Sequence, residues 1–460
     1  MALIKSISGI RGTIGGEPGK NLTPPDIIKF TSAFATWVQR KHPRNKKIII
    51  GRDGRMSGEM VSNFCSNTLI ACGFDVIDLG ITTTPTVEIA VQIENAAAGI
   101  ILTASHNPQE WNALKLLSDK GEFISAEDGA EVLDIAEKEN FIFADVQKIG
   151  TYIEDRSYLQ KHIDAVINYK LVDVAAVKNA KFKIVVDGIN SSGAVYVPAL
   201  LKALGVKDIV VLFGEITGKF GHNPEPLPAN LTSLSAEVKK QNAHLGIAVD
   251  PDVDRLCFVC EDGAMFGEEY TLVAVADYVL SKRPGNTVSN MSSTKALKEL
   301  TMKYGGSYFP SAVGEVNVVN KMKEVNAVIG GEGNGGIIVP DFHYGRDALI
   351  GIGLFLTHLA QSGKTVNQLR GTYPDYFISK NKIALETTVD VKEVFKKIQD
   401  KYKTHPINTE DGLKIEFDKD WVHLRTSNTE PIIRIYSESN FETTAENIAK
   451  KIMKDIREAM

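Results

Sequence analysis

Short apolar runs that stop abruptly at polar or glycine-rich residues recur along this 460-residue chain. One of them, residues 97–102, leads directly into the sequence TASHNP at 103–108. Such runs are typical of interior strands of a parallel sheet, and the Asn-Pro pair marks a loop. Open α/β sheets bind ligands beyond the carboxyl ends of their strands. We therefore expect a reacting hydroxyl at Ser105, with an ordinary serine in a polar turn as the alternative.

The same pattern predicts alternating strands and helices in the amino-terminal part of the chain. The expected elements are a helix over 24–40, a strand over 47–51, a helix over 58–72, a strand over 75–78 and a helix over 158–169. Apolar runs ending near 187, 249 and 329 break into acidic or glycine-rich loops in the same way. This alternation indicates several related α/β units.

The carboxyl-terminal segment changes character after Arg370. Strands are expected over 387–390, 413–417 and 421–425, with helices beside them. The order differs from the strand–helix alternation before it and favours an α+β domain at this end of the chain.

Composition and charge exclude several classes of protein. An apolar content of 43% and a charged content of 24% are ordinary for a globular protein. The net charge of −5 predicts no nucleic-acid partner. No apolar run approaches the roughly 20 residues that a membrane span requires. The first residues show no secretory signal, so we expect a cytoplasmic protein that does not bind a membrane.

Four cysteines in so long a chain fit a reducing compartment. Cys257 and Cys260 form a C-x-x-C sequence, which also occurs in zinc and redox sites. Here they lie in an apolar strand-like run, where residues three apart face opposite sides. We therefore interpret both as core residues.

Three carboxylates alternate in the sequence DPDVD, where Asp250, Asp252 and Asp254 follow an apolar strand. Oxygen ligands at this spacing suit Mg²⁺, which often shares its coordination sphere with a phosphate. An EF-hand is excluded because Arg255 stands where that loop requires glycine. A phosphatase loop is disfavoured because Asp254 occupies its Thr or Val position, and a solvated acidic turn is the remaining alternative.

Two further loops carry candidate ligand-binding residues. Glu332 and Asn334, in the glycine-rich stretch 330–336, offer acceptors and donors suited to the hydroxyls of a sugar. The stretch RTSNTEP at 425–431 places Arg425 before hydroxyl and amide side chains, which suits a phosphate dianion. A tight turn and a capping turn, respectively, are the alternatives.

Together these loops resemble those of the α-D-phosphohexomutases, the superfamily of phosphoglucomutases, phosphomannomutases and phosphoglucosamine mutases. TASHNP resembles the family's phosphoserine loop, DPDVDR its metal loop, GEGNGG its sugar loop and RTSNTEP its phosphate loop, in the family's order. The resemblance implies three related α/β domains with mixed, largely parallel sheets and a carboxyl-terminal α+β domain around a central active-site cleft. We place these domains at 1–151, 152–258, 259–372 and 373–460.

The resemblance also implies a chemistry. Ser105, as a phosphoserine, would donate its phosphoryl group to a sugar monophosphate, with a hexose 1,6-bisphosphate as intermediate and activator. One Mg²⁺ per chain would be held by Asp250, Asp252, Asp254 and a phosphoryl oxygen on Ser105. Arg11, Arg255 and Lys115 would surround the transferring group, with Lys115 at the family's acid/base position. His106 would brace the loop or act in the chemistry.

Substrate recognition is implied by the same resemblance. The sugar would contact Glu332, Asn334 and a loop of Val313, Gly314 and Glu315. The phosphate would contact Arg425, Ser427, Asn428 and Thr429. The partner expected is therefore a small-molecule sugar phosphate, and both a monomer and a homodimer stay open.

The chain departs from the family pattern in ways that bear on the substrate. Gly336 stands where many relatives carry a histidine, so a proton-transfer role for that histidine does not carry over. Pro251 and Asn428 are similar to the glucose and mannose branch, whereas the 313–315 loop resembles the glucosamine branch. We favour glucosamine phosphate, with mannose and glucose phosphates as alternatives. A phosphatase and a non-catalytic sugar-phosphate sensor are the competing functions.

Overall fold

The structure, a computed structural model, describes residues 3–6, 9–385, 390–426 and 432–460. The chain forms two compact units, one of Met1–Thr271 with Gly335–Leu369 and one of Leu272–Asn334 with Arg370–Met460. The chain passes between these units at three points: within helix α9 (Glu268–Lys282), between Asn334 and Gly335, and within helix α13 (Val366–Arg370). Within the described ranges, no helix combines the length and the apolar character needed to cross a membrane.

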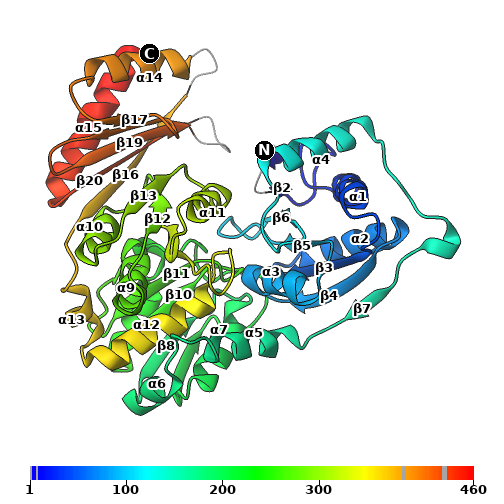
Figure 1. The fold of residues 1–460 in the computed structure, drawn as a ribbon, viewed down its shortest axis with the longest axis horizontal. Coiled ribbons are helices and arrows are strands. Elements are labelled where there is room, and N and C mark those ends of the chain that lie inside the picture. The colour runs from blue at the N-terminus through cyan, green and yellow to red at the C-terminus, as the bar shows by residue number, and fades with distance from the viewer. Residues whose placement is uncertain (1–2, 7–8, 386–389, 427–431) are drawn as a thin grey trace. The chain divides into compact units, whose positions relative to one another are not determined.

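A seven-stranded mixed sheet opens the first unit, in the order β1-β2-β6-β5-β3-β4-β7 (Figure 1). Its strands are β1 (Ile4–Ser6), β2 (Gly9–Thr13), β3 (Lys47–Arg52), β4 (Asp75–Ile81), β5 (Ala98–Leu102), β6 (Trp111–Leu117) and β7 (Tyr152–Glu154). The apolar run before Ser105 is β5, an interior strand as expected. It is parallel to β3 but antiparallel to β6, so the sheet is parallel on only one side of it.

Helices cover both faces of this sheet. They are α1 (Pro24–Lys41), α2 (Gly58–Ala71), α3 (Thr84–Ile93) and α4 (Ala126–Lys138). Helices α1, α2 and α4 bury their apolar sides in one core, and α3 contributes Val87, Ala90 and Val91 to another. The first two helices therefore lie where the sequence predicted them, within about one residue at each end.

The second sheet of this unit has the order β11-β10-β8-β9. Its strands are β8 (Lys183–Asp187), β9 (Asp208–Leu212), β10 (Leu245–Val249) and β11 (Leu256–Cys260). Helices α5 (Tyr158–Ile167), α6 (Val174–Ala180), α7 (Gly193–Ala203) and α8 (Thr232–Lys240), strand β15 (Gly336–Ile338) and helix α12 (Ala348–Ser362) also belong to this unit, as do the short 3₁₀ turns Val146–Lys148 and Pro228–Asn230. Helix α5 ends two residues before the predicted limit. Cys257 and Cys260 are buried on β11, as expected.

In the second unit, β12 (Thr287–Asn290) lies between β13 (Tyr308–Ser311) and β14 (Ile329–Glu332) and is parallel to both. Helices α10 (Ala296–Lys303) and α11 (Glu315–Glu324) accompany these strands. The apolar run that ends near residue 329 was expected to be a strand, whereas β14 begins at Ile329 and continues to Glu332. Because the glycines at 330 and 331 belong to β14, Glu332 ends a strand and does not lie in the middle of a loop.

An antiparallel sheet ends the chain, in the order β16-β20-β19-β18-β17. Its elements are β16 (Phe377–Ala384), α14 (Val391–Lys401), β17 (Ile407–Asn408), β18 (Leu413–Glu416), β19 (Trp421–Thr426), β20 (Ile432–Ser439) and α15 (Glu442–Ala459), drawn from orange to red in Figure 1. Both helices share one apolar core with the sheet. The strands expected over 413–417 and 421–425 are confirmed, whereas residues 387–389 lie outside the described residues.

The predicted fold class is confirmed. Mixed sheets with α/β connections are followed by an α+β domain at the carboxyl end of the chain. The domain limits expected at 151, 258 and 372 stay predictions. Strand β7, which begins at Tyr152, pairs with β4 of the first sheet.

Candidate functional site

Ser105 lies on the turn that follows β5, in a conformation that its own neighbours maintain. Its φ of +49° is in the left-handed region, which costs free energy for a residue other than glycine. The Ser105 N–H donates to Oγ1 of Thr103 at 2.9 Å, and Thr103 donates to Oδ2 of Asp53 at 2.6 Å. All three residues are buried. Buried hydrogen bonds thus hold the turn in a defined conformation, and it is not a solvated polar loop.

Arg55 supports the same turn, although no motif in the sequence pointed to it. Its guanidinium donates to the carbonyl oxygens of Ser105 at 2.5 Å, Asn107 at 2.7 Å, Pro108 at 2.6 Å and Trp111 at 2.9 Å. Its Nε donates to Oδ2 of Asp53 at 3.0 Å. Arg55 follows the neighbouring strand β3, so the order of strands in the sheet brings it to the serine turn.

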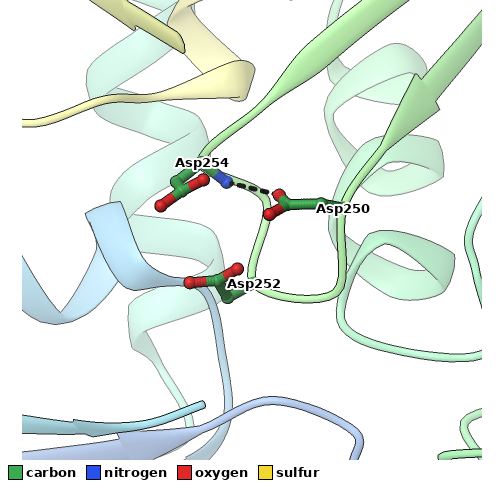
Figure 2. A group of neighbouring side chains, drawn as sticks. All are labelled: Asp250, Asp252 and Asp254. Atoms are coloured by element: carbon green, nitrogen blue, oxygen red, sulfur yellow. Dashed lines mark hydrogen bonds between the residues drawn. The ribbon is translucent and has the colours of Figure 1, made fainter. Parts of the chain in front are cut away.

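The three aspartates occupy the tight connection from β10 to β11 (Figure 2). Oδ1 of Asp250 accepts the N–H groups of Asp254 and Arg255, each at 3.1 Å. Val253 has a φ of +62°, an unusual conformation for a β-branched residue. One carboxylate oxygen from each aspartate lies within 4.8 Å of the others, and all three side chains are buried.

The serine turn and the aspartate loop meet directly. Ser105 Oγ donates to Oδ2 of Asp250 at 2.7 Å. Lys115, on β6, donates through Nζ to Oδ2 of Asp252 at 2.7 Å and lies 3.5 Å from Oδ2 of Asp254. The Lys115 side chain is only 3% exposed, so it does not face the solvent.

The donor set fits a hard divalent cation. Among the described residues, Oδ1 of Asp252 and Oδ1 of Asp254 are buried without any hydrogen-bond partner. Buried carboxylate oxygens left in this way are costly unless a cation or a proton compensates them. Three clustered carboxylates are the kind of oxygen ligand that Mg²⁺ takes. Asp250, Asp252 and Asp254 are therefore able to hold such an ion.

The electrostatics of the cluster point the same way. Burial, together with the charges of Asp254 and Asp252, raises the pKa of Asp250 well above its ordinary value. Burial by itself would raise the pKa of Asp252 as well, but the nearby charge and hydrogen bond of Lys115 have the larger effect, so the pKa of that carboxyl is lowered. The two neighbouring aspartates likewise overcome the burial of Lys115 and raise its pKa. The crowded negative charge would be relieved by a bound cation.

Three other predicted residues surround the serine turn. Arg11 donates from Nη1 to Oδ1 of Asn107 at 2.7 Å, and burial lowers its pKa to about 10. Arg255 pairs through Nη1 with Glu225 at 3.3 Å, and its Nε is 3.9 Å from Oδ2 of Asp250. His106 Nδ1 lies 3.4 Å from Ser105 Oγ. Burial and nearby arginines lower the pKa of His106 well below its usual value, which favours a neutral imidazole.

The predicted sugar-binding residues gather within the second unit. Oε1 of Glu332 accepts Nδ2 of Asn290 at 2.9 Å and the N–H of Gly314 at 3.0 Å. Asn334 Nδ2 lies 3.4 Å from the other Glu332 oxygen. Gly314 has a φ of +115°, which suits only glycine at this turn before α11. Glu315 is buried at the start of that helix.

Asp411 joins this group to the predicted phosphate loop. Its Oδ2 accepts the Val313 N–H at 2.9 Å and lies 3.4 Å from Nε of Arg425. The sequence did not single out Asp411. The other predicted phosphate ligands, Ser427, Asn428 and Thr429, lie outside the described residues.

His423 lies beside Asp411, and we expect its buried hydrogen bonds to make the stability of the protein sensitive to acid. Nδ1 pairs with Ser292 Oγ at 2.8 Å and Nε2 with the Asp411 carbonyl oxygen at 2.6 Å, and burial lowers the pKa of His423 from 6.5 to about 4. Below pH 6.5 the unfolded chain binds a proton at His423 that the folded protein does not bind until about pH 4. The free energy of unfolding therefore decreases as the pH falls from 6.5 toward 4. The loss should reach about 3 kcal/mol, since one pKa unit corresponds to about 1.4 kcal/mol.

Thermal unfolding of the wild type and of His423→Gln between pH 7 and pH 4 tests this expectation. The difference in midpoint should shrink as the pH falls, because only the histidine must take up a proton on unfolding. A difference that is independent of pH would contradict it.

Fold comparison identifies the class of protein as a phosphohexomutase. The crystal structure of a phosphoglucomutase/phosphomannomutase family protein from Burkholderia thailandensis matches with a TM-score of 0.86 at 25% identity, over 99% of this chain and 97% of that one. Sequence comparison finds the phosphoglucomutase/phosphomannomutase α/β/α domain I over residues 3–143, domain II over 160–263, domain III over 267–376 and the C-terminal domain over 383–455.

Curated relatives agree with this class. A phosphoglucomutase/phosphomannomutase of Thermococcus kodakarensis is 36% identical over 98% of both chains. A phosphoglucosamine/phosphogalactosamine mutase of Sulfurisphaera tokodaii is 30% identical over 99% of both chains. The chain belongs to the phosphoglucomutase/phosphomannomutase family.

Proposed function

We propose that this protein interconverts hexose 6-phosphate and hexose 1-phosphate through a phosphorylated Ser105. The observation that carries this proposal is the contact of Ser105 Oγ with Asp250 at 2.7 Å, on the loop that also holds Asp252 and Asp254. Catalysed phosphoryl transfer depends mainly on positioning and on neutralising negative charge. The buried serine turn supplies the first. Arg11, Arg255 and Lys115, together with a cation that the aspartates would hold, supply the second.

In the forward step, a hydroxyl oxygen of the hexose monophosphate forms a bond to phosphorus while the bond from phosphorus to Ser105 Oγ breaks. The hexose hydroxyl loses its proton and the serine oxygen gains one. We assign both transfers to Lys115, which as an ammonium gives a proton to the serine oxygen and takes one from the hexose hydroxyl. The hexose 1,6-bisphosphate then reorients and returns its other phosphoryl group to Ser105. Arg11 and Arg255 hold the transferring group.

The three aspartates would hold one Mg²⁺, which supplies compensation for the negative charge of the phosphoryl group. The proposed ligands are Asp250, Asp252 and Asp254 with a phosphoryl oxygen on Ser105. His106 braces the serine turn through its position beside Oγ, 3.4 Å away.

For the substrate we propose glucosamine phosphate, with mannose and glucose phosphates as alternatives. The 313–315 loop and Glu332 are joined by the Gly314 hydrogen bond of 3.0 Å, which supports a shared role of the two in sugar recognition. The names of the relatives divide between the same substrates. Values of kcat/KM for the glucosamine, mannose and glucose 1-phosphates, measured with the matching bisphosphate, test the order.

Replacing Arg425 by alanine should raise the KM for the hexose phosphate by about 10- to 100-fold and change kcat much less. A guanidinium that binds the substrate's phosphate contributes equally to the ground state and the transition state. Steady-state kinetics measure both constants, and Arg457→Ala, on the last helix, serves as the control. An unchanged KM would contradict the role of Arg425.

A further inference from the structure

Arg346 contacts the aspartate loop, although the sequence did not point to it. It lies just before α12, and its Nη2 donates to Oδ2 of Asp254 at 2.6 Å. Lys115 approaches the same oxygen at 3.5 Å, whereas Oδ1 of Asp254 has no hydrogen-bond partner among the described residues. The Arg346 side chain is 9% exposed. One oxygen of this carboxylate is thus held by cations and the other is left for a further ligand.

A buried network of two histidines and two carboxylates holds the position of Arg346. Oδ1 of Asp347 caps α12 by accepting the N–H groups of Leu349 and Ile350. Its Oδ2 contacts Nε2 of His162 at 2.9 Å and Nε2 of His343 at 3.1 Å. Because Asp347 follows Arg346 directly in the chain, these contacts fix the backbone from which the guanidinium extends.

The two histidines also contact helix α3, which in turn hydrogen-bonds to Asp252. His162 Nδ1 lies 2.8 Å from Oγ1 of Thr86, and His343 Nδ1 lies 3.4 Å from Oε2 of Glu88. On the first turn of α3, Thr84 donates through Oγ1 to Oδ2 of Asp252 at 2.6 Å and through its N–H to the Asp252 carbonyl oxygen at 2.9 Å. The network therefore connects Arg346, which contacts Asp254, with Thr84, which contacts Asp252.

We propose that Arg346 is a positioning residue for metal binding, which holds Oδ2 of Asp254 so that Oδ1 stays available to the cation. The network of His162, His343, Asp347 and Glu88 in turn holds Arg346 and Thr84 against the aspartate loop. Groups that orient metal ligands affect metal affinity or activity by about 10- to 100-fold. The inference rests on the proposed metal role of the aspartates.

Calorimetric titration of the dephosphorylated full-length protein with Mg²⁺ tests the proposal without relying on turnover. Arg346→Gln is expected to weaken Mg²⁺ binding by about 10- to 100-fold. Arg346→Lys, which keeps the charge, should recover part of the affinity. His162→Gln should weaken binding by a smaller factor. Arg156→Gln is the matched control, because Arg156 also pairs with an aspartate, Asp78, but is 52% exposed.

A purely electrostatic role of Arg346 would change Mg²⁺ binding in the opposite direction. If Arg346 acted only as a positive charge, its removal would strengthen the attraction between the aspartates and the cation. Unchanged or tighter Mg²⁺ binding in Arg346→Gln therefore overturns the proposal, as does a wild-type protein that binds no Mg²⁺. If Arg346→Gln does not fold, Arg346→Lys and His162→Gln must each still weaken binding relative to the control.

Steady-state kinetics separate this inference from the proposed function. The Mg²⁺ concentration for half-maximal activity should rise in Arg346→Gln, with the KM for hexose phosphate changed less than about threefold. A wild-type protein that binds Mg²⁺ without mutase turnover contradicts the proposed function. The binding comparison among the variants then still decides the role of Arg346.

Discussion

Replacement of Ser105 by alanine is expected to lower kcat by about 10³- to 10⁵-fold and to remove the phosphoryl group from the protein. The variant would lose the oxygen that we propose as the carrier of the phosphoryl group, whereas the loops that we propose as the sugar-phosphate site would be unchanged. Steady-state kinetics with a hexose bisphosphate measure the first effect. Intact mass after incubation with the same bisphosphate measures the second.

Ser157→Ala is a suitable control, since Ser157 is an exposed serine of the same unit. It should retain both turnover and the added phosphoryl group. Near-wild-type turnover of Ser105→Ala would contradict the phosphoserine mechanism. Hydrolysis of the hexose phosphate without isomerisation would instead favour a phosphatase, with an aspartate of the metal loop as nucleophile.

Replacement of Lys115 by methionine is expected to abolish most activity and to destabilise the first unit by about 3–5 kcal/mol. Lys115 is buried and pairs with Asp252 at 2.7 Å and with Asp254 at 3.5 Å. Its removal leaves buried negative charge that is compensated only in part. Hydrogen exchange of the amides in β5 and β6 measures the change in stability where the residue lies.

The same measurement with Mg²⁺ gives a second expectation. A cation bound to the folded state should reduce the loss of stability, because it compensates the same carboxylates. Lys138→Met is the control, since Lys138 pairs with Asp134 on an exposed helix surface and should contribute less than about 0.5 kcal/mol. Equal effects of the two substitutions would contradict the structural role of Lys115.

The sequence predicted the elements and residues that depend on local pattern. The apolar run before Ser105 is a strand, and the alternating carboxylates at Asp250, Asp252 and Asp254 do converge. Both predictions succeed because each motif is short and directly follows a buried strand, so the strand determines where it lies. The end of β14 was misplaced because glycine is more typical of loops than of strands, and only pairing with β12 shows that residues 330 and 331 continue the strand.

The residues that support these motifs could not be predicted in this way. Arg55 is 50 residues from Ser105, Thr84 is 168 residues from Asp252, and Arg346 is 92 residues from Asp254. None belongs to a recognisable motif, and each acts through one or a few hydrogen bonds. Their roles follow from the order of strands in the sheets and from the helix starts that face the aspartate loop.

The sequence by itself determined the family resemblance and the fold class, and it predicted the reactive side chains, because these follow from short motifs and from the periodicity of apolar residues. Only the tertiary structure decided that Lys115 is a buried cation and that Ser105 contacts Asp250. It also showed that Arg55, Thr84 and Arg346 form hydrogen bonds to the two loops. The physical reason is that burial and charge compensation depend on contacts between distant segments, which no local pattern in the chain records.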